Sequence, residues 1–280
     1  MDDIKLLADL HKRTERQGPG GDRETGKAID LATLDRARPL RIADLGCGTG
    51  ASALQLARSL NAEITAVDIL PEFIEELGRR AARARLKGKI KPVVGSMENL
   101  QFEEEAFDVI WSEGAIYNIG FQRGITDWMR FLRPGGVLAV SEITWMTSDR
   151  PVEVQRYWHK WYPEIATASR KMGILENTGY SPIGYFALPK HCWMENYYQP
   201  LQGGFESFLA RHNGSEQARA IVSAEEQEIA LYEKYGEHYS YGFYIARKPV
   251  AGGALSSSPS VMNWQPGQIS AGDGDGGAII

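Results

Sequence analysis

Apolar runs alternate with helix-forming segments between about residues 40 and 145, and this alternation constrains the fold of the 280-residue chain more than any other feature. The runs that read as strands are RIADLG, EITAVDI, IKPVVGS, FDVIWSEG and VLAVSEITW, and the helical segments are SALQLARSL, PEFIEELGRRAARARL and ITDWMRFL. Strands joined through helices make right-handed crossovers, which build a parallel sheet with both faces covered. We therefore expect an α/β fold.

A glycine-rich loop, ADLGCGTG, follows the first of these strands and leads into the first helix. Gly46, Gly48 and Gly50 have the spacing G-x-G-x-G, whereas loops that bind a dinucleotide pyrophosphate have G-x-G-x-x-G. Asp44, two residues before the first glycine, would repel a pyrophosphate but suits a ligand with a cationic amino group. The bare glycine backbone lets an adenosyl group lie close. Asp68, at the end of the next strand, is placed to accept both hydroxyls of a ribose.

Five segments of this region resemble, in order and at suitable separations, the successive motifs of the class I S-adenosylmethionine-dependent methyltransferases: ADLGCGTG, AVDILPEF, GSMENLQF, FDVIWSEGAIYNI and FLRPGGVLAVSE. The resemblance covers about residues 38 to 145 and, more narrowly, is to the small-molecule branch known as type 11. It implies S-adenosyl-L-methionine as the cofactor. It also implies a Rossmann-like, seven-stranded, mostly parallel sheet with helices on both faces and an antiparallel last strand, whose final hairpin YSPIGYFALP and YGFYIARKP would supply.

The same resemblance implies which residues hold the cofactor. Asp44 and the loop glycines would contact its methionine part, Asp68 its ribose and Ile69 its adenine ring. The full set expected is Asp44, Gly46, Cys47, Gly48, Asp68, Ile69, Ser96, Met97, Glu98 and Ser112. The chain departs from the family at Ser96, where an aspartate is common. We therefore expect the contact with the adenine amino group to be weaker or to move to Glu98.

The loop after the fourth predicted strand, EGAIYN, is where we expect the methyl acceptor to bind. Glu113, Tyr117 and Asn118 are our candidate catalytic residues, because they follow this strand at the point nearest the donor methyl. The loop lacks the N/D-P-P-Y/F sequence that enzymes methylating adenine or glutamine nitrogens carry there, and it offers no histidine base. Alignment of donor and acceptor can contribute roughly 7 to 11 kcal/mol, so a strong base is not required. The alternative is that Tyr117 packs under the next helix.

We divide the chain into three parts. Residues 1–37 are expected to form an N-terminal helical cap, with Ile4, Leu7, Ala8 and His11 on one helix face and Asp22 capping a second helix. Residues 38–249 form the methyltransferase domain, with aromatic-rich helical insertions after residue 145. Residues 250–280 are rich in glycine and serine and contain no Lys, Arg or Glu, so we expect a disordered tail.

Three questions stay open at this level. The segment QGPGG, residues 17–21, is either a simple helix breaker or a flap over the cofactor. Glu142, at the end of the fifth predicted strand, either faces the pocket or braces a neighbouring loop. If the loop after the fourth strand does not form the acceptor site, that site is expected at His191, Trp193 and the helix around Trp158.

Charge and cysteine content exclude several classes of protein. With 31 basic and 36 acidic residues the formal net charge is −5, which disfavours nucleic acid as a partner, and the arginines of RRAARAR read as the solvated face of a helix. Two cysteines cannot form a disulfide framework, Cys47 reads as a small loop residue, and the five histidines lack the spacing of metal ligands. No apolar run reaches the roughly 20 residues of a membrane span, and the start lacks the order of a secretory signal. We expect a cytoplasmic protein without a metal; nothing indicates its oligomeric state.

Together these features predict a methyltransferase that moves the methyl of S-adenosylmethionine to an O, N or S atom of a small metabolite. The aromatic residues after Trp145 suit a partly apolar acceptor or a cation held by π faces, although core packing explains them as well. The alternatives are an RNA methyltransferase, which the charge and the acceptor loop disfavour, and a non-catalytic protein that binds S-adenosylmethionine.

Overall fold

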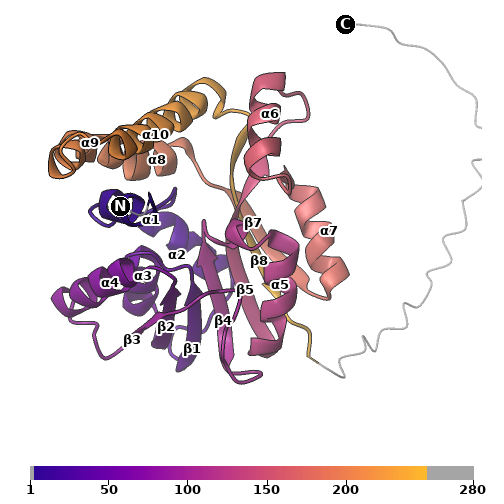
Figure 1. The fold of residues 1–280 in the computed structure, drawn as a ribbon. Helices are drawn as coiled ribbons and strands as arrows, with labels where there is room; N and C mark the ends of the chain where they lie inside the picture. Colours follow the sequence, from indigo (N-terminus) through magenta and orange to yellow (C-terminus); the bar gives the residue numbers. More distant parts are fainter. Residues whose placement is uncertain (1–2, 251–280) are drawn as a thin grey trace, which may run out of the picture. The chain divides into compact units, whose positions relative to one another are not determined.

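The computed structural model describes residues 3–250, which form one compact unit built on a single mixed sheet (Figure 1). The strands run in the order β3-β2-β1-β4-β5-β8-β7, and a short strand, β6, pairs with β5. All neighbours are parallel from β3 to β5, whereas β8 is antiparallel to both β5 and β7. The strands are β1 (Leu40–Leu45), β2 (Ala62–Asp68), β3 (Ile90–Val94), β4 (Phe107–Glu113), β5 (Leu132–Trp145), β6 (Ala166–Thr167), β7 (Ser181–Ala187) and β8 (Tyr239–Arg247). The predicted sheet is confirmed.

Helices cover both faces of this sheet, as predicted. On one face α2 (Asp22–Leu31), α3 (Ala51–Ser59) and α4 (Pro71–Arg83) share a core with Ile42 of β1 and Phe243 of β8. On the other face α5 (Phe121–Trp128) and α7 (Ala168–Thr178) pack against Ala43 and Tyr244, the next residue along each strand. Successive side chains of a strand point to opposite faces, so the two cores alternate along the chain.

A layer of helices lies beyond the first face. It contains α1 (Asp3–His11), α8 (Lys190–Trp193), the π-helical turn η3 (Met194–Tyr198), α9 (Gln199–Arg211) and α10 (Glu216–Tyr235). Figure 1 shows α1 between α9 and α10 on one side and α4 on the other, and α1 contacts all three. The Asp9 carboxylate accepts from Arg211 Nη2 at 2.9 Å. Segments some two hundred residues apart therefore meet above the carboxyl ends of the strands.

Two details of the N-terminal segment differ from the prediction. Ile4 and Leu7 are 59% and 43% exposed, whereas Leu6 and Leu10 are buried, because α1 is contacted by α4 as well as by α9 and α10. Asp22 is the first helical residue of α2 and makes no side-chain cap; the cap position is Gly21. The predicted tail, residues 250–280, lies outside the described residues except for Val250.

The segments around the sheet also differ in detail. The helix around Trp158, α6 (Val152–Trp161), buries only Val154, leaves Trp161 64% exposed and ends before Ile165. Pro134 to Gly136 lie inside β5, where the pairing with β4 shifts register. No helix among residues 3–250 is both long and apolar enough to cross a membrane.

Glu142 braces the fold and does not face the pocket. Its Oε1 atom accepts from Lys171 Nζ on α7 at 2.8 Å, and neither side chain is exposed. The Lys171 ammonium also lies over the rings of Phe121 and Tyr162, 4.6 Å and 5.2 Å from their centroids. Burial raises the pKa of Glu142 and lowers that of Lys171. The pair joins β5 to the helices of the second face.

Replacing only one partner of the Glu142–Lys171 pair should destabilise the protein more than replacing both partners. We expect Lys171→Met to lower the free energy of unfolding by roughly 3 to 5 kcal/mol, because it leaves an uncompensated buried carboxylate. The double change Glu142→Leu with Lys171→Met should recover much of that loss. Urea unfolding of the two variants measures both. A double variant as unstable as the single one would contradict this account.

Candidate active site

The glycine loop joins β1 to α3 at the carboxyl edge of the sheet. Gly46 and Gly48 have φ angles of 71° and 55°, in the left-handed region that favours glycine. A Cβ on Gly46 would lie 2.3 Å from the Cβ of Ala115, and one on Gly48 would lie 2.4 Å from Oε1 of Gln17. These two positions therefore have no room for a side chain. Their closest neighbours come from the acceptor loop and from the N-terminal segment.

Asp68 ends β2 beside this loop. Its Oδ2 atom accepts from the Gly48 amide at 2.9 Å and its Oδ1 atom from the Leu70 amide at 3.0 Å, so the carboxylate fixes the glycine loop to the start of α4. Burial raises the pKa of Asp68, against the effect of these hydrogen bonds. Each carboxylate oxygen keeps a further lone pair. The side chain can therefore take part in loop structure and still accept hydrogen bonds from a ribose.

A cavity of about 570 Å³ opens between this edge of the sheet and the helices above it. Most of the residues named from the sequence line it, namely Gly46, Cys47, Gly48, Asp68, Ile69, Ser96, Met97, Glu98, Glu113, Tyr117 and Asn118. The structure therefore brings the expected cofactor residues and the expected acceptor residues to one pocket.

Two of the named residues, Asp44 and Ser112, lie beneath this pocket and do not line it. Both are fully buried. Oδ2 of Asp44 accepts from the Ser52 hydroxyl at 2.7 Å, while Asp44 Oδ1 and the Ser112 hydroxyl have no hydrogen-bond partner among residues 3–250. Burial raises the pKa of Asp44 to about 7. Asp44 thus supports the loop from below, and its role as a direct cofactor ligand remains a proposal.

Glu113, at the end of β4, accepts three hydrogen bonds. Its carboxylate accepts from Arg16 at 2.9 Å, from the Thr25 hydroxyl at 2.7 Å and from Trp111 Nε1 at 2.9 Å. Arg16 and Thr25 belong to the N-terminal segment, so Glu113 fastens that segment to the edge of the sheet. Three of the four lone pairs of the carboxylate are used in these contacts. Among the predicted catalytic residues, we therefore assign Glu113 a positioning role.

The segment QGPGG covers the glycine loop, as the flap interpretation requires. Gln17 Oε1 accepts from the Thr49 amide at 2.8 Å, and Gly18 and Pro19 line the cavity. Arg80 of α4 donates to the carbonyl groups of Thr14 and Glu15, at 2.7 Å and 2.8 Å. One arginine of the expected solvated face is therefore only 17% exposed and holds the flap in place.

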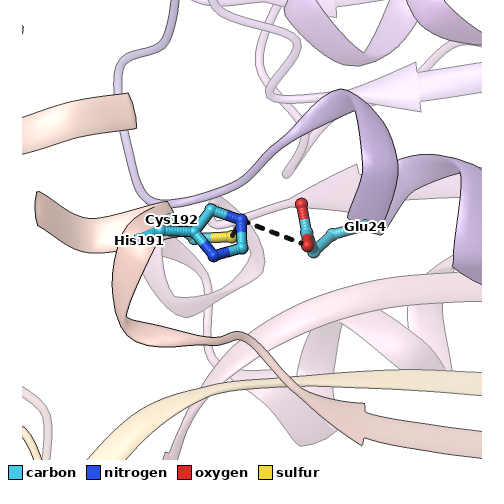
Figure 2. A group of neighbouring side chains, drawn as sticks. All are labelled: Glu24, His191 and Cys192. Carbon is cyan, nitrogen blue, oxygen red and sulfur yellow. Dashed lines mark hydrogen bonds and ion pairs between the residues drawn. The ribbon is translucent and has the colours of Figure 1, made fainter. Parts of the chain in front are cut away.

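One group of three metal-binding side chains occurs within residues 3–250: Glu24, His191 and Cys192 (Figure 2). His191 Nε2 lies 3.3 Å from Glu24 Oε1 and 3.7 Å from Cys192 Sγ, distances suited to direct hydrogen bonds. Burial raises the pKa of the Cys192 thiol, and Glu24 adds to the effect, so the sulfur stays protonated without a metal. The Cys192 carbonyl accepts from the Gly20 amide at 3.4 Å. The group therefore ties α8 to the flap.

Several residues of the pocket were not expected from the sequence. They come from α1, the flap, η3 and α10, and include His11, Arg16, Gln17, Tyr197, Glu225 and Glu228. Glu225 and Glu228 are three residues apart, a spacing that places them on one helix face. This spacing is the feature of the sequence that could have pointed to these two residues, but it does not show what that helix face contacts.

These residues fit an adenosyl cofactor. The left-handed glycines leave room for a ligand against the backbone, Asp68 presents acceptors to a ribose, and Ile69 offers an apolar surface that is 65% exposed. Ligands of open α/β sheets bind outside the carboxyl ends of the strands, where this pocket lies. The fold and the site together define an α/β protein that binds an adenosyl cofactor.

Comparison with known proteins places the chain more narrowly. The family model described as a methyltransferase domain matches residues 42–136. The 27-O-demethylrifamycin SV methyltransferase of Amycolatopsis mediterranei is 24% identical over 219 residues, 75% of this chain and 77% of that protein. The O-methyltransferase rstn1 of Aspergillus nomiae is 25% identical over 193 residues, 64% of this chain and 86% of that one.

A solved structure agrees with these matches. A methyltransferase from Geobacter sulfurreducens, in complex with S-adenosyl-L-homocysteine, superposes with a TM-score of 0.76 at 18% identity, covering 86% of this chain and 97% of that one. The chain belongs to the class I S-adenosylmethionine-dependent methyltransferases. Its cofactor is S-adenosyl-L-methionine.

Removing the Asp68 carboxylate should weaken cofactor binding. Hydrogen bonds to charged groups contribute roughly 1.5 to 3 kcal/mol each, so Asp68→Ala should raise the dissociation constant for S-adenosylhomocysteine at least about tenfold. Calorimetric titration measures it. Glu63→Ala, at an exposed position of the same strand, is the matched control and should bind normally. Equal constants for the two variants would remove Asp68 from the cofactor site.

Proposed function

We propose that this methyltransferase acts on an O, N or S atom of a small molecule held at the far end of the same cavity. The observation that carries the proposal is the continuity of the cavity: Gly46 and Asp68 line one part of it, and Tyr117, Asn118 and Tyr197 line another. A cavity of this size is typical of small-molecule sites. Of the relatives named above, one is described as a methyltransferase of 27-O-demethylrifamycin SV and the other as an O-methyltransferase, which agrees with it.

The residues of the chain act by placing the acceptor. When bound, S-adenosylmethionine supplies a methyl group on a sulfonium, which a lone pair on the acceptor attacks in line. Asn118 donates to the Ala115 carbonyl at 2.9 Å, which fixes the turn that carries Tyr117. Glu113 and Arg16 hold the flap beside that turn. Because the methyl donor is reactive in itself, this alignment is the main contribution we assign to the protein.

One feature favours the alternative of an RNA methyltransferase. It is a groove of about 950 Å³ between α1, α3 and α4 that is lined by basic side chains. Its basic side chains are Lys12, Arg13, Arg16, Arg58, Arg79, Arg80 and Arg83. Each of them lies within 4.0 Å of a carboxylate of Asp9, Asp22, Glu76 or Glu113. A phosphate would have to compete with these carboxylates. We therefore favour a small molecule over nucleic acid, and we propose a cytoplasmic location, consistent with two unpaired cysteines.

Transfer of a labelled methyl group tests this function. The protein is incubated with methyl-labelled S-adenosylmethionine and either a fractionated metabolite extract or total RNA, and S-adenosylhomocysteine is measured. We expect label in a small-molecule fraction. Label in RNA would support the RNA methyltransferase instead. Tight binding of S-adenosylhomocysteine without turnover in any fraction would support a non-catalytic binding protein.

Substitutions in the acceptor loop should lower the rate of methyl transfer and leave the affinity for the cofactor unchanged. We expect Tyr117→Phe and Asn118→Ala to lower kcat roughly tenfold, because orientation of the acceptor is used in the transition state. The dissociation constant for S-adenosylhomocysteine should stay within about twofold of that of the unchanged protein. Gln122→Ala, exposed on the following helix, is the matched control. Unchanged kcat in both loop variants would place the acceptor elsewhere.

A further inference from the structure

The far end of the cavity is walled by side chains from four elements that lie far apart in the sequence. They are His11 of α1, Tyr117 of the 3-10 turn Ile116–Asn118, Tyr197 of η3, and Glu225 and Glu228 of α10. All five line the same cavity as the cofactor residues. The chemistry of this wall is therefore the chemistry that the methyl acceptor meets.

The wall carries two carboxylates and one imidazole. Glu225 Oε1 lies 3.0 Å from Nε2 of His11, while the Nδ1 atom of that buried ring has no hydrogen-bond partner. Glu228 Oε1 accepts from the Tyr198 hydroxyl at 3.0 Å. The one guanidinium of the lining, Arg16, is held by Glu113 and Asp22. The formal charge of the wall is thus negative, and its acids are satisfied only in part.

Glu228 is poised between its two protonation states. Burial raises its pKa to about 7, and the neighbouring charge of Glu225 acts in the same direction. The Tyr198 hydrogen bond and His11 oppose this rise. The other titratable groups around Glu228 are tyrosines, namely Tyr117, Tyr157, Tyr197, Tyr239 and Tyr241. A bound cation would favour the ionised carboxylate and would itself be stabilised by it.

Aromatic rings form the rest of the wall. Tyr197 is buried and stacks on His11 with 6.3 Å between ring centroids. Tyr117 is 40% exposed and lines the cavity, so it can contact a ligand. Tyrosine faces attract cations within about 6 Å of the ring centroid. Carboxylates and tyrosine faces around one space favour an occupant that carries positive charge and some apolar surface.

We infer that the acceptor is an amine, which this wall binds as its ammonium ion between the tyrosines and the two α10 carboxylates, and that Glu228 takes the ammonium proton. The inference rests on the function proposed above and names its substrate class. The amine nitrogen, once neutral, uses its lone pair to form the N–C bond while the C–S bond breaks and its electron pair stays on sulfur. The products are an N-methylammonium ion, S-adenosylhomocysteine and a protonated Glu228, which then releases its proton to solvent.

A negatively charged acceptor fits the same wall poorly. A phenolate, thiolate or carboxylate would lie beside Glu225 and Glu228 with no unpaired cation to offset them. A neutral alcohol would leave the aromatic and acidic groups without a charge to recognise. These two classes are the alternatives that the experiments must separate.

The first experiment tests whether the cavity binds a positively charged ligand in preference to an uncharged one, in the absence of methyl transfer. Choline, whose nitrogen cannot be methylated further, and its uncharged isostere 3,3-dimethyl-1-butanol are titrated into the protein saturated with S-adenosylhomocysteine. We expect choline to bind at least tenfold more tightly than the isostere and Glu228→Gln to abolish the difference. Glu226→Gln, at an exposed position of the same helix, is the control and should bind choline as the unchanged protein does. Equal binding of choline and its isostere would overturn the inference.

The second experiment tests the proton acceptor. With 2-phenylethylamine as acceptor, kcat/KM should rise with pH through about 7, because Glu228 must be ionised to take the proton. Tyr198→Phe removes a hydrogen bond that stabilises the ionised form, so this rise should move to higher pH, and in Glu228→Gln it should vanish. A merely structural role for either residue would leave the midpoint in place.

The matched acceptors 2-phenylethanol and 2-phenylethanethiol complete the test. Turnover of either, with none of the amine, would overturn the inference and leave the proposed methyl transfer intact. If none of the three is turned over, the choline titration decides the substrate class. Failure of the proposed function itself is distinct, since it would appear as binding of S-adenosylhomocysteine without methyl transfer to any metabolite fraction. Retained affinity for S-adenosylhomocysteine in Glu228→Gln shows that the variant is folded.

Discussion

The pocket depends on one carboxylate. Glu113 ends β4 and receives hydrogen bonds from Arg16, Thr25 and Trp111, so a single side chain joins the sheet, the flap and α2. Without it the Arg16 guanidinium, 10% exposed, would lose its closest anionic partner, and the flap over the glycine loop would lose its anchor. One of the three residues expected to be catalytic, Glu113, thus helps to assemble the site.

The two halves of the pocket are encoded differently. The cofactor half comes from short segments that each end a parallel strand, so neighbouring strands alone bring Gly48 and Asp68 within hydrogen-bond distance. The acceptor half is gathered from α1, η3 and α10, and its chemistry is set by which helix faces meet there. The cofactor half can therefore be recognised from short motifs in the sequence, while the acceptor half cannot.

This difference decides what the sequence could predict. Strand and helix periodicity are local, which is why the parallel strands, their helices and the position of Asp68 follow from the sequence. The antiparallel last strand followed from the resemblance to the methyltransferase family. Asp44 and Ser112 lie inside β1 and β4, and their burial depends on what packs against those strands, which the spacing of the motifs does not record. Glu228 and Tyr197 lie far along the chain from the motifs, on helices whose packing partners could not be known. The exposure of Ile4 and Leu7 has the same origin, since the face of α1 is chosen by α4, α9 and α10 together.

The contact of α1 with α9 and α10 also sets the order in which the protein is completed. His11 meets Glu225 across 214 positions, and Arg211 meets Asp9 across 202. Contacts so distant in sequence close late, because the entropy of the intervening chain must be overcome first and because α1 leaves the ribosome long before α10. Until α9 and α10 are made, α1 lacks two of the three helices that it contacts in the finished fold. We therefore expect the wall that we propose to bind the acceptor to be among the last parts of the molecule to form.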